Sequence, residues 1–155
     1  MKIKLILLNL CLVGLLTVIT LVGSQTPTIK SNEVFTHKDG NLKFRGWGQA
    51  EETHRWSVGN RSVILFKFKE DKKSLVGEIE FQGGSLGQQH IIAKLNGTKI
   101  HDGMMEAKLK MKFAPKLLKG KNQENELAFE LPDARVPGNG DMRRLAIYFS
   151  SLVIR

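Results

Sequence analysis

Apolar and polar residues alternate with a period of two through most of the chain after Leu42, and glycine, asparagine or aspartate interrupts the alternation at short intervals. The segment 62–69, for example, places Ile64, Phe66 and Phe68 on one face. Because successive side chains of a β-strand point to opposite faces, this period predicts half-buried strands rather than helices. The expected fold class is therefore an antiparallel all-β domain.

The same alternation predicts further strands at residues 75–81, 90–95, 98–100, 107–113 and 125–131, and a last strand at 145–149 with 152–154. The dipeptide Asn96-Gly97 tolerates the positive φ values of a tight hairpin turn, so two of these strands are expected to form a hairpin. About seven or eight strands in a chain of this length predict a two-layer sandwich.

The first residues have the order of an export signal. Lys2 and Lys4 precede the charge-free apolar run from Leu5 to Val22, as the basic and hydrophobic regions of a secretory signal do. Such a hydrophobic region has at most about 15 residues, whereas a membrane-spanning helix needs roughly 17–25. The run therefore predicts a hydrophobic helix in residues 1–24 that is either a cleaved signal peptide or a retained membrane anchor.

Both fates place the rest of the chain outside the cytoplasm, because cationic flanks stay on the cytoplasmic side. Small residues up to Ser24 make cleavage before Gln25 one of the two alternatives. The expected localisation is periplasmic, either anchored in the inner membrane or released. Residues 25–41 have no sustained period and are interpreted as a linker, and residues 42–155 as the β-sandwich domain.

Composition limits the chemistry of the exported part. The only cysteine of the chain, Cys11, lies inside the apolar run, so neither a disulfide nor a thiolate-bound metal is expected in the exported part. The net charge of +9 favours acidic partners such as anionic lipid headgroups, lipopolysaccharide or phosphorylated glycans. The lysines also alternate with apolar residues, which is typical of the solvated face of a strand and is the preferred interpretation. A nucleic-acid partner is not expected outside the cytoplasm.

The two tryptophans flank a polar cluster that is the main candidate binding site. Between Trp47 and Trp56 lie Glu52, His54 and Arg55. An indole beside carboxylate and guanidinium groups can bind a sugar, because a sugar has an apolar C–H side ringed by hydroxyl groups. The alternative is a structural role, with Trp56 in the core and the charged residues paired locally. Burial tendencies favour an exposed Trp47 and a buried Trp56.

A second group of candidate residues precedes the last strand. Asp141 and Arg143 are two residues apart and are expected to form a bidentate carboxylate–guanidinium clamp that pins the loop 132–140. Arg144 is expected to point the other way and to meet an anionic group.

No catalytic constellation is apparent. The four histidines are scattered without the spacing of a metal site, and neither a metal nor a cofactor is expected. Glu51 and Glu52 are adjacent and would face opposite sides of a strand, whereas the two carboxylates of a glycosidase flank one bond across about 5–10 Å. The chain is therefore not expected to be an enzyme.

Short glycine-rich motifs in residues 42–155 resemble a known family. These motifs are Gly46-Trp47-Gly48, residues 51–57 with Gly59, residues 89–91 and 95–97, Pro132-Asp133-Ala134 with Pro137, residues 140–147 and residues 151–154. They are similar to a jelly-roll domain of bacterial envelope proteins that is often appended to phosphoglycerol transferases and membrane glycosyltransferases. The resemblance implies a galactose-binding-like, carbohydrate-module architecture without catalysis by the domain itself.

The 155-residue sequence contains no segment of such an enzyme, so the domain is expected to act in trans or in another role. The leading hypothesis is a non-catalytic exported module that binds a glycan or a glycan-bearing component of the cell envelope. Its expected partners are an envelope glycan or a polysaccharide-modifying membrane protein, with the membrane itself contacted through residues 5–22 if these are retained. The alternative is a structural or accessory subunit that docks on a larger envelope or secretion complex.

Overall fold

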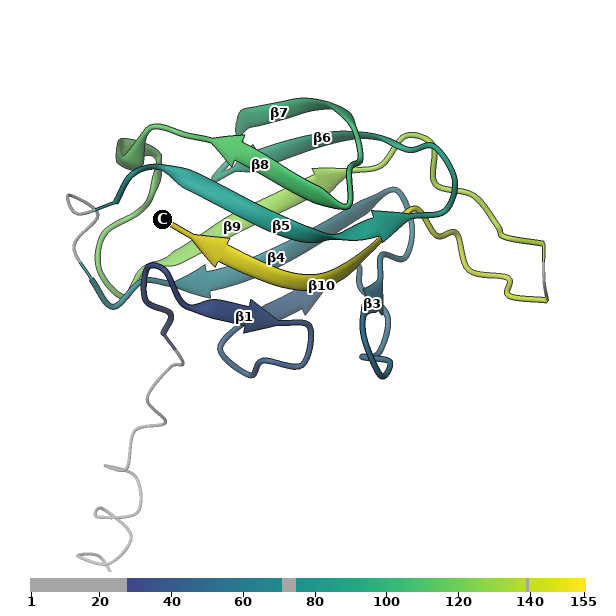
Figure 1. Cartoon of the computed structure of the whole chain (residues 1–155), viewed down its shortest axis with the longest axis horizontal. Helices are drawn as coiled ribbons and strands as arrows, with labels where there is room; N and C mark the ends of the chain where they lie inside the picture. Colours follow the sequence, from purple (N-terminus) through teal and green to yellow (C-terminus); the bar gives the residue numbers. More distant parts are fainter. Residues whose placement is uncertain (1–27, 71–74, 139) are drawn as a thin grey trace, which may run out of the picture.

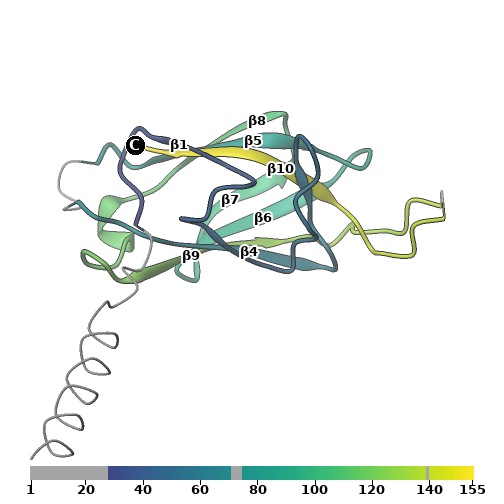
Figure 2. The same ribbon diagram turned by 90° about the horizontal axis from the view of Figure 1, so that it is seen from below.

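The structure, a computed structural model, describes residues 28–70, 75–138 and 140–155. These residues form two antiparallel β-sheets packed face to face (Figures 1 and 2), which confirms the predicted all-β, two-layer architecture. The hydrophobic helix and cleavage site predicted in residues 1–24 lie outside the described residues. Within the described ranges, no helix is long and apolar enough to cross a membrane.

The strands alternate between the two sheets along the chain, except that β6 and β7 follow one another in the same sheet. Their bounds are β1 (Val34–Thr36), β2 (Lys43–Arg45), β3 (Arg55–Trp56), β4 (Arg61–Lys67), β5 (Glu78–Ser85), β6 (His90–Leu95), β7 (Thr98–Met104), β8 (Lys108–Lys112), β9 (Glu124–Glu130) and β10 (Ile147–Ile154), and a short 3-10 helix, η2 (Pro115–Leu117), precedes β9. One sheet has the order β1-β10-β5-β8, with β3 also pairing with β10, and the other has the order β2-β4-β9-β6-β7.

The core lies between the sheets and is built from the apolar side chains that the period-two pattern places inward. Phe81, Phe129 and Phe149 are fully buried there, and their rings contact one another at centroid distances of 5.0 Å for Phe81–Phe129 and 5.3 Å for Phe81–Phe149. Burial of such aromatic side chains supplies much of the hydrophobic stabilisation of a small sandwich.

The predicted hairpin at Asn96-Gly97 is confirmed. Both residues have positive φ values, 49° and 85°, and Leu95 pairs with Thr98 across the turn. The Asn96 side chain also donates a hydrogen bond to Asn125 Oδ1 at 2.8 Å. Because Asn125 is fully buried, this turn is joined to the sandwich interior as well as to its two strands.

The outer face of the second sheet is less solvated than its alternating pattern predicts. Val63, Leu65 and Ala128 lie on this face and are nevertheless buried. Three ion pairs surround the strip, namely Lys43–Glu124, Arg61–Glu126 and Lys94–Glu130. Long charged side chains cover apolar surface with their methylene stems while their charged groups stay in water.

The domain begins earlier than the boundary predicted at residue 42. Ile29 is fully buried, bridges to Phe68 and is part of the core. Phe35 in β1 is 3% exposed. The assignment of residues 25–41 as a linker is therefore wrong from residue 28 onward. The reason is that a three-residue strand is too short to show a period, and its place is set by pairing with β10.

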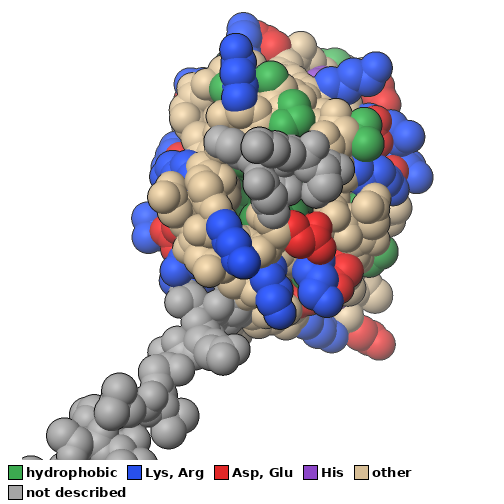
Figure 3. Space-filling view, turned by 90° about the vertical axis from the view of Figure 1, so that its left-hand side faces the viewer, with side chains coloured by type: hydrophobic (Ala, Val, Ile, Leu, Met, Phe, Trp, Pro, Cys, Tyr) green, Lys and Arg blue, Asp and Glu red, His purple; other side chains and the backbone are tan. Residues whose placement is uncertain are grey.

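The sandwich has two distinct ends. At the entry end, the chain enters at Ile29 beside the end of β4, and the C-terminal Arg155 exchanges backbone hydrogen bonds with Glu78. Figure 3 looks onto this end. The far end carries the loop that contains β3 and the loop before β10 (Figure 1).

Candidate functional site

A hairpin at the far end decides where the two tryptophans point. Gly46, with φ of 70°, turns the chain into it, and a side chain at this position would meet the Arg61 carbonyl oxygen. Trp47 then pairs with Ser57 in an antiparallel bridge. Residues opposite each other in such a pair point to the same face, whereas neighbours along a strand point to opposite faces. Trp47 therefore follows the buried Ser57 inward, and Trp56 points outward.

Trp47 is partly buried and packs against the core, rather than being exposed as predicted. Its ring lies 6.2 Å from the Phe129 ring and 5.9 Å from the Phe149 ring, measured between centroids. Its indole N–H donates a hydrogen bond of 3.1 Å to the Val63 carbonyl oxygen. The flanking glycines suggested exposure, but cross-strand pairing with Ser57 overrides that local signal.

Trp56, predicted to be buried, is instead partly exposed on the outer face of the first sheet. It pairs with Tyr148 of β10, and the two rings meet nearly edge to face at 5.2 Å. His54, two residues earlier on the same face, lies 4.8 Å from the Tyr148 ring and 5.6 Å from the Trp56 ring. We call His54, Trp56 and Tyr148 the aromatic cluster.

Gly84 makes room for the aromatic cluster. It lies opposite Tyr148 in the pairing of β5 with β10, and a Cβ atom at Gly84 would lie 2.5 Å from the tyrosine ring. The ring thus rests directly on the glycine backbone, and the absence of a side chain there fixes its position.

Polar groups border the aromatic cluster. Thr53 Oγ1 lies 2.9 Å from His54 Nδ1, and Glu51 Oε2 lies 3.2 Å from the buried His54 Nε2 without the alignment of a hydrogen bond. The neighbouring Arg143 carries a positive charge that interacts with Glu51. A hydroxyl and a carboxylate group thus lie beside His54, and the guanidinium of Arg143, from the loop before β10, interacts with this carboxylate.

The predicted pair between Asp141 and Arg143 forms. Arg143 Nη2 donates a hydrogen bond of 2.6 Å to Asp141 Oδ2, and Nε donates to Oδ1 at 3.0 Å. The side chain and backbone N–H of Arg143 lower the pKa of Asp141 to about 2, and the carboxylate raises the pKa of Arg143. Its guanidinium lies beside Gly48, so the pair lies against the β3 hairpin.

Arg55 makes its contacts with groups inside the fold. It lies opposite Phe149 in the pairing of β3 with β10, and therefore points inward. Its guanidinium donates to the carbonyl oxygens of His37 and Gly48 and lies 4.3 Å above the Phe44 ring. Burial lowers the pKa of Arg55. Its donors are directed at backbone carbonyl groups inside the fold, and its role in ligand binding stays a prediction.

Arg144 and Glu52 do not belong to the aromatic cluster. Arg144, expected to meet an anion, donates through Nε and Nη2 to the Ala134 carbonyl oxygen at 3.2 and 2.6 Å, so it ties the loop before β10. The Glu52 side chain is exposed and makes no hydrogen bond or ion pair with a residue that the structure describes. Of the six predicted ligand-binding residues, the structure brings together His54 and Trp56.

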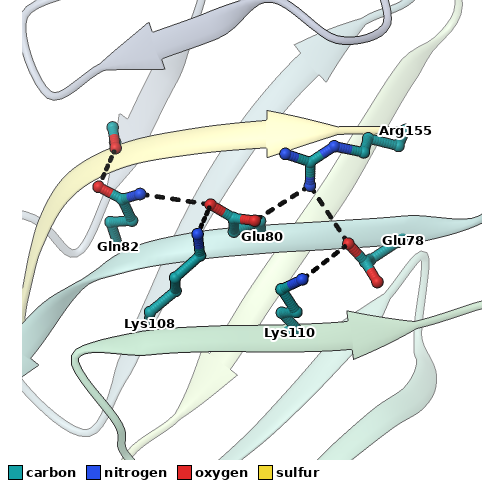
Figure 4. Close-up of polar contacts among 7 residues, drawn as sticks. Glu78, Glu80, Gln82, Lys108, Lys110 and Arg155 are labelled. Atoms are coloured by element: carbon teal, nitrogen blue, oxygen red, sulfur yellow. Dashed lines mark hydrogen bonds and ion pairs between the residues drawn. The ribbon is translucent and has the colours of Figure 1, made fainter.

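Among the residues that the structure describes, the most buried carboxylate belongs to an ion network on the first sheet (Figure 4). Glu80 is 4% exposed, and its carboxylate accepts from Arg155 at 3.1 Å and lies 2.8 Å from Lys108 Nζ. These contacts lower the pKa of Glu80 to about 2, and the hydrogen bond from Lys108 contributes most, followed by those from Gln82 and Arg155. Both carboxylate oxygens of Glu80 have a partner within this network, so the arrangement is suited to holding strands together.

The described residues contain no group of three or more His, Cys, Asp and Glu side chains that could hold a metal ion. His90 lies 2.9 Å from Asp102, which also pairs with Lys99 at 2.7 Å, and Lys99 lowers the pKa of this carboxyl group. These residues form an exposed ion-pair group on β6 and β7.

Sequence reasoning missed Tyr148 and Gly84 as parts of the candidate site. Tyr148 is the only tyrosine of the chain and lies between two inward apolar residues of the last strand, so strand parity predicts that it points outward. That signal could have singled it out. No sequence signal could place Gly84 beneath it, because that contact depends on the register of β5 and β10.

A scan against protein-family models finds no match for this chain, and no curated protein matches it.

Proposed function

We propose that this protein is a non-catalytic exported module that binds a glycan, or a glycan-bearing component of the bacterial cell envelope, through the aromatic cluster. The observation that carries the proposal is the convergence of His54, Trp56 and Tyr148 on the outer face of the first sheet, with Glu51 beside His54.

Physical chemistry favours a sugar at such a place. Aromatic rings gain van der Waals and CH–π contact with the apolar face of a pyranose, and the surrounding polar groups can bind its hydroxyl groups. The Asp141–Arg143 pair is already formed, so little side-chain entropy is lost if a ligand hydroxyl contacts its edge.

The strand order supports a jelly roll of the galactose-binding-like type as the finer description of the fold. From β4 to β10 the chain crosses repeatedly between the sheets, and the orders β1-β10-β5-β8 and β4-β9-β6-β7 are those of two interleaved Greek keys. The resemblance to the jelly-roll domain of envelope transferases agrees with this topology and with a glycan as ligand. Export to the periplasm, through residues 1–24 as signal or anchor, is part of the same proposal.

The two tryptophans make the proposal directly testable. Trp47 is held in the core and Trp56 lies in the aromatic cluster, and the chain has no other tryptophan. Titration with neutral envelope oligosaccharides should change the fluorescence of the wild-type protein in a saturable way. The Trp56→Phe variant retains Trp47 as a reporter of folding and should lose the fluorescence change.

Affinity provides the quantitative arm of the test. By calorimetry, Trp56→Ala and Tyr148→Ala should each weaken binding by about tenfold or more, which corresponds to roughly 1.4 kcal/mol. Glu52→Gln is the control, since this exposed side chain lies outside the cluster. The proposal is refuted if no oligosaccharide binds, or if both alanine variants bind as well as the wild type.

A second candidate function is a docking subunit of a larger envelope or secretion complex. It is favoured by the loop before β10, where Val136 and Met142 are 45% and 82% exposed. Exposed apolar side chains on one loop are typical of a protein contact. A stoichiometric protein partner that is lost with Met142→Ser and kept with Trp56→Ala would favour this function over glycan binding.

A further inference from the structure

Lysines without acidic partners gather at the entry end of the sandwich. Five of them are exposed and make no ion pair with any residue that the structure describes, namely Lys69, Lys112, Lys116, Lys119 and Lys121. Figure 3 shows Lys and Arg side chains projecting around the rim of this end. We call these five residues the basic end.

Backbone contacts place the basic end beside the entry of the chain. Lys69 donates its N–H to the Ile29 carbonyl oxygen, and Asn122, next to Lys121, donates to Phe68. Lys112 lies opposite Glu78 at the start of β5. Most lysines elsewhere on the sheets are paired, so the unbalanced charge is concentrated where the N-terminal segment joins the fold.

The acidic groups of this end are largely engaged by other residues. Glu33 lies 3.7 Å from Lys30, and Glu78 lies 3.2 Å from Arg155. Glu70 accepts a hydrogen bond of 2.7 Å from Ser31. Ser31 is uncharged, so Glu70 keeps its negative charge, whereas Glu33 and Glu78 are each paired with a cation. The five lysines of the basic end therefore outnumber the carboxylates left to balance them.

An exposed apolar side chain lies at the same end. Val76 is 82% exposed and immediately precedes Gly77, whose N–H bonds the carbonyl oxygen of Arg155 and whose carbonyl oxygen accepts from Phe113. A combination of cations and a projecting apolar residue is typical of protein surfaces that lie on a membrane interface.

Only a short stretch of chain connects the basic end to the apolar N-terminal segment. Ile29 is fixed in the core, and the chain from Val22 to Ile29 spans at most about 25 Å when fully extended. If residues 5–22 are retained as the anchor proposed above, the basic end cannot move far from the headgroups. We propose that the basic end docks on anionic phospholipid headgroups, and that this contact orients the aromatic cluster at the far end away from the membrane.

The test places a fluorescent probe at each end of the full-length chain in lipid vesicles. Val76→Cys and Met142→Cys are matched positions, because both side chains are 82% exposed and lie at opposite ends. Cys11→Ser removes the only native cysteine. An environment-sensitive fluorophore at position 76 should shift to the blue in vesicles containing phosphatidylglycerol but not in pure phosphatidylcholine. The same fluorophore at position 142 should not shift in either.

Charge variants and salt give two independent arms. Neutralising Lys116, Lys119 and Lys121 to glutamine should lower the ratio of docked to undocked protein by roughly a hundredfold, about fivefold for each lysine. High salt should abolish the shift of the probe in the protein that keeps all of its lysines. This measurement does not depend on a substitution that could disturb folding. Neutralising Lys38 and Arg45, which lie away from the basic end, should leave the shift in place.

Several results would overturn the inference. These are an equal shift in both lipids, no shift in either, or a shift that survives both neutralisation and high salt. A shift produced by soluble polyphosphate in phosphatidylcholine vesicles would assign the surface to a soluble polyanion instead. The inference rests on the proposed anchor. If the protein is bound to neither kind of vesicle, the anchor is refuted. If the protein is bound to the vesicles but the probe does not shift, the docking surface alone is refuted.

Discussion

Replacing Glu80 by glutamine removes the central charge of the ion network on the first sheet while keeping the shape of the side chain. Glu80 is 4% exposed and is covered by Lys108 and Arg155, which contact it at 2.8 and 3.1 Å. The variant leaves both cations without their shared carboxylate. We therefore expect the sandwich to lose stability although no core residue has changed.

The size of the loss follows from the pKa of Glu80. A decrease from the ordinary value of 4.5 to about 2 corresponds to about 3 kcal/mol of stabilisation when the carboxyl group is ionised. Water screens part of this interaction, since the Lys108 side chain is 55% exposed and that of Arg155 is 35% exposed. We expect Glu80→Gln to lower the free energy of unfolding by about 2 kcal/mol at pH 7.

The pH dependence has a definite sign. The folded-state pKa is lower than the unfolded-state pKa, so the stabilisation is complete above about pH 5 and is lost as the pH falls towards 2. At pH 3 the difference in stability between wild type and Glu80→Gln should be less than half of its value at pH 7. Near pH 2 the difference should nearly vanish.

Urea denaturation followed by far-ultraviolet circular dichroism at pH 7, 4 and 3 measures this difference. Glu126→Gln is the matched control, because its ion pair with Arg61 is exposed on the other sheet and should contribute less than about 1 kcal/mol. Equal losses for the two variants at pH 7, or a loss for Glu80→Gln that does not shrink at pH 3, would refute the reasoning.

Three further predictions concern packing and buried polar groups. Trp47→Ala should lower the free energy of unfolding by about 3 kcal/mol, and Trp56→Ala by about 1 kcal/mol, because only Trp47 packs against the core; equal losses in urea denaturation would contradict this assignment. Asn125→Ala should cost about 2–3 kcal/mol in the same assay, since the buried amide accepts hydrogen bonds from Asn96 and from the Lys119 backbone; a loss below about 0.5 kcal/mol would count against it. Gly84→Ala should displace the tyrosine ring that a Cβ atom would approach to 2.5 Å, which would appear as altered aromatic NMR shifts in a folded protein; unchanged shifts would contradict the contact.

The all-β class, the two-layer architecture and the Asn96-Gly97 turn could be predicted because each rests on local information. Period-two alternation over five or more residues determines which face of a strand is buried, whatever the strand pairs with. The short strand β1 could not be found in this way. Its position depends on pairing with β10, more than a hundred residues away.

The candidate site was predicted only in part, for a related reason. The polar residues around His54 were recognised from their types, but the side to which each one points depends on the register of the β3 hairpin. That register sends Trp47 and Arg55 inward and Trp56 outward. It also brings Tyr148 next to Trp56 from the other end of the chain.

The amino-acid sequence by itself thus determined a basic chain with an apolar N-terminal run followed by an antiparallel β domain, because hydrophobic period, charge and turn residues act over a few neighbouring positions. Tertiary structure alone decided which tryptophan lies on the outer face of the first sheet, which glutamate is buried and where, among the described residues, the lysines without ion pairs gather. Each of these depends on contacts between strands distant in the chain. In a sheet, a shift of one residue in register would reverse the face on which every side chain of that strand lies.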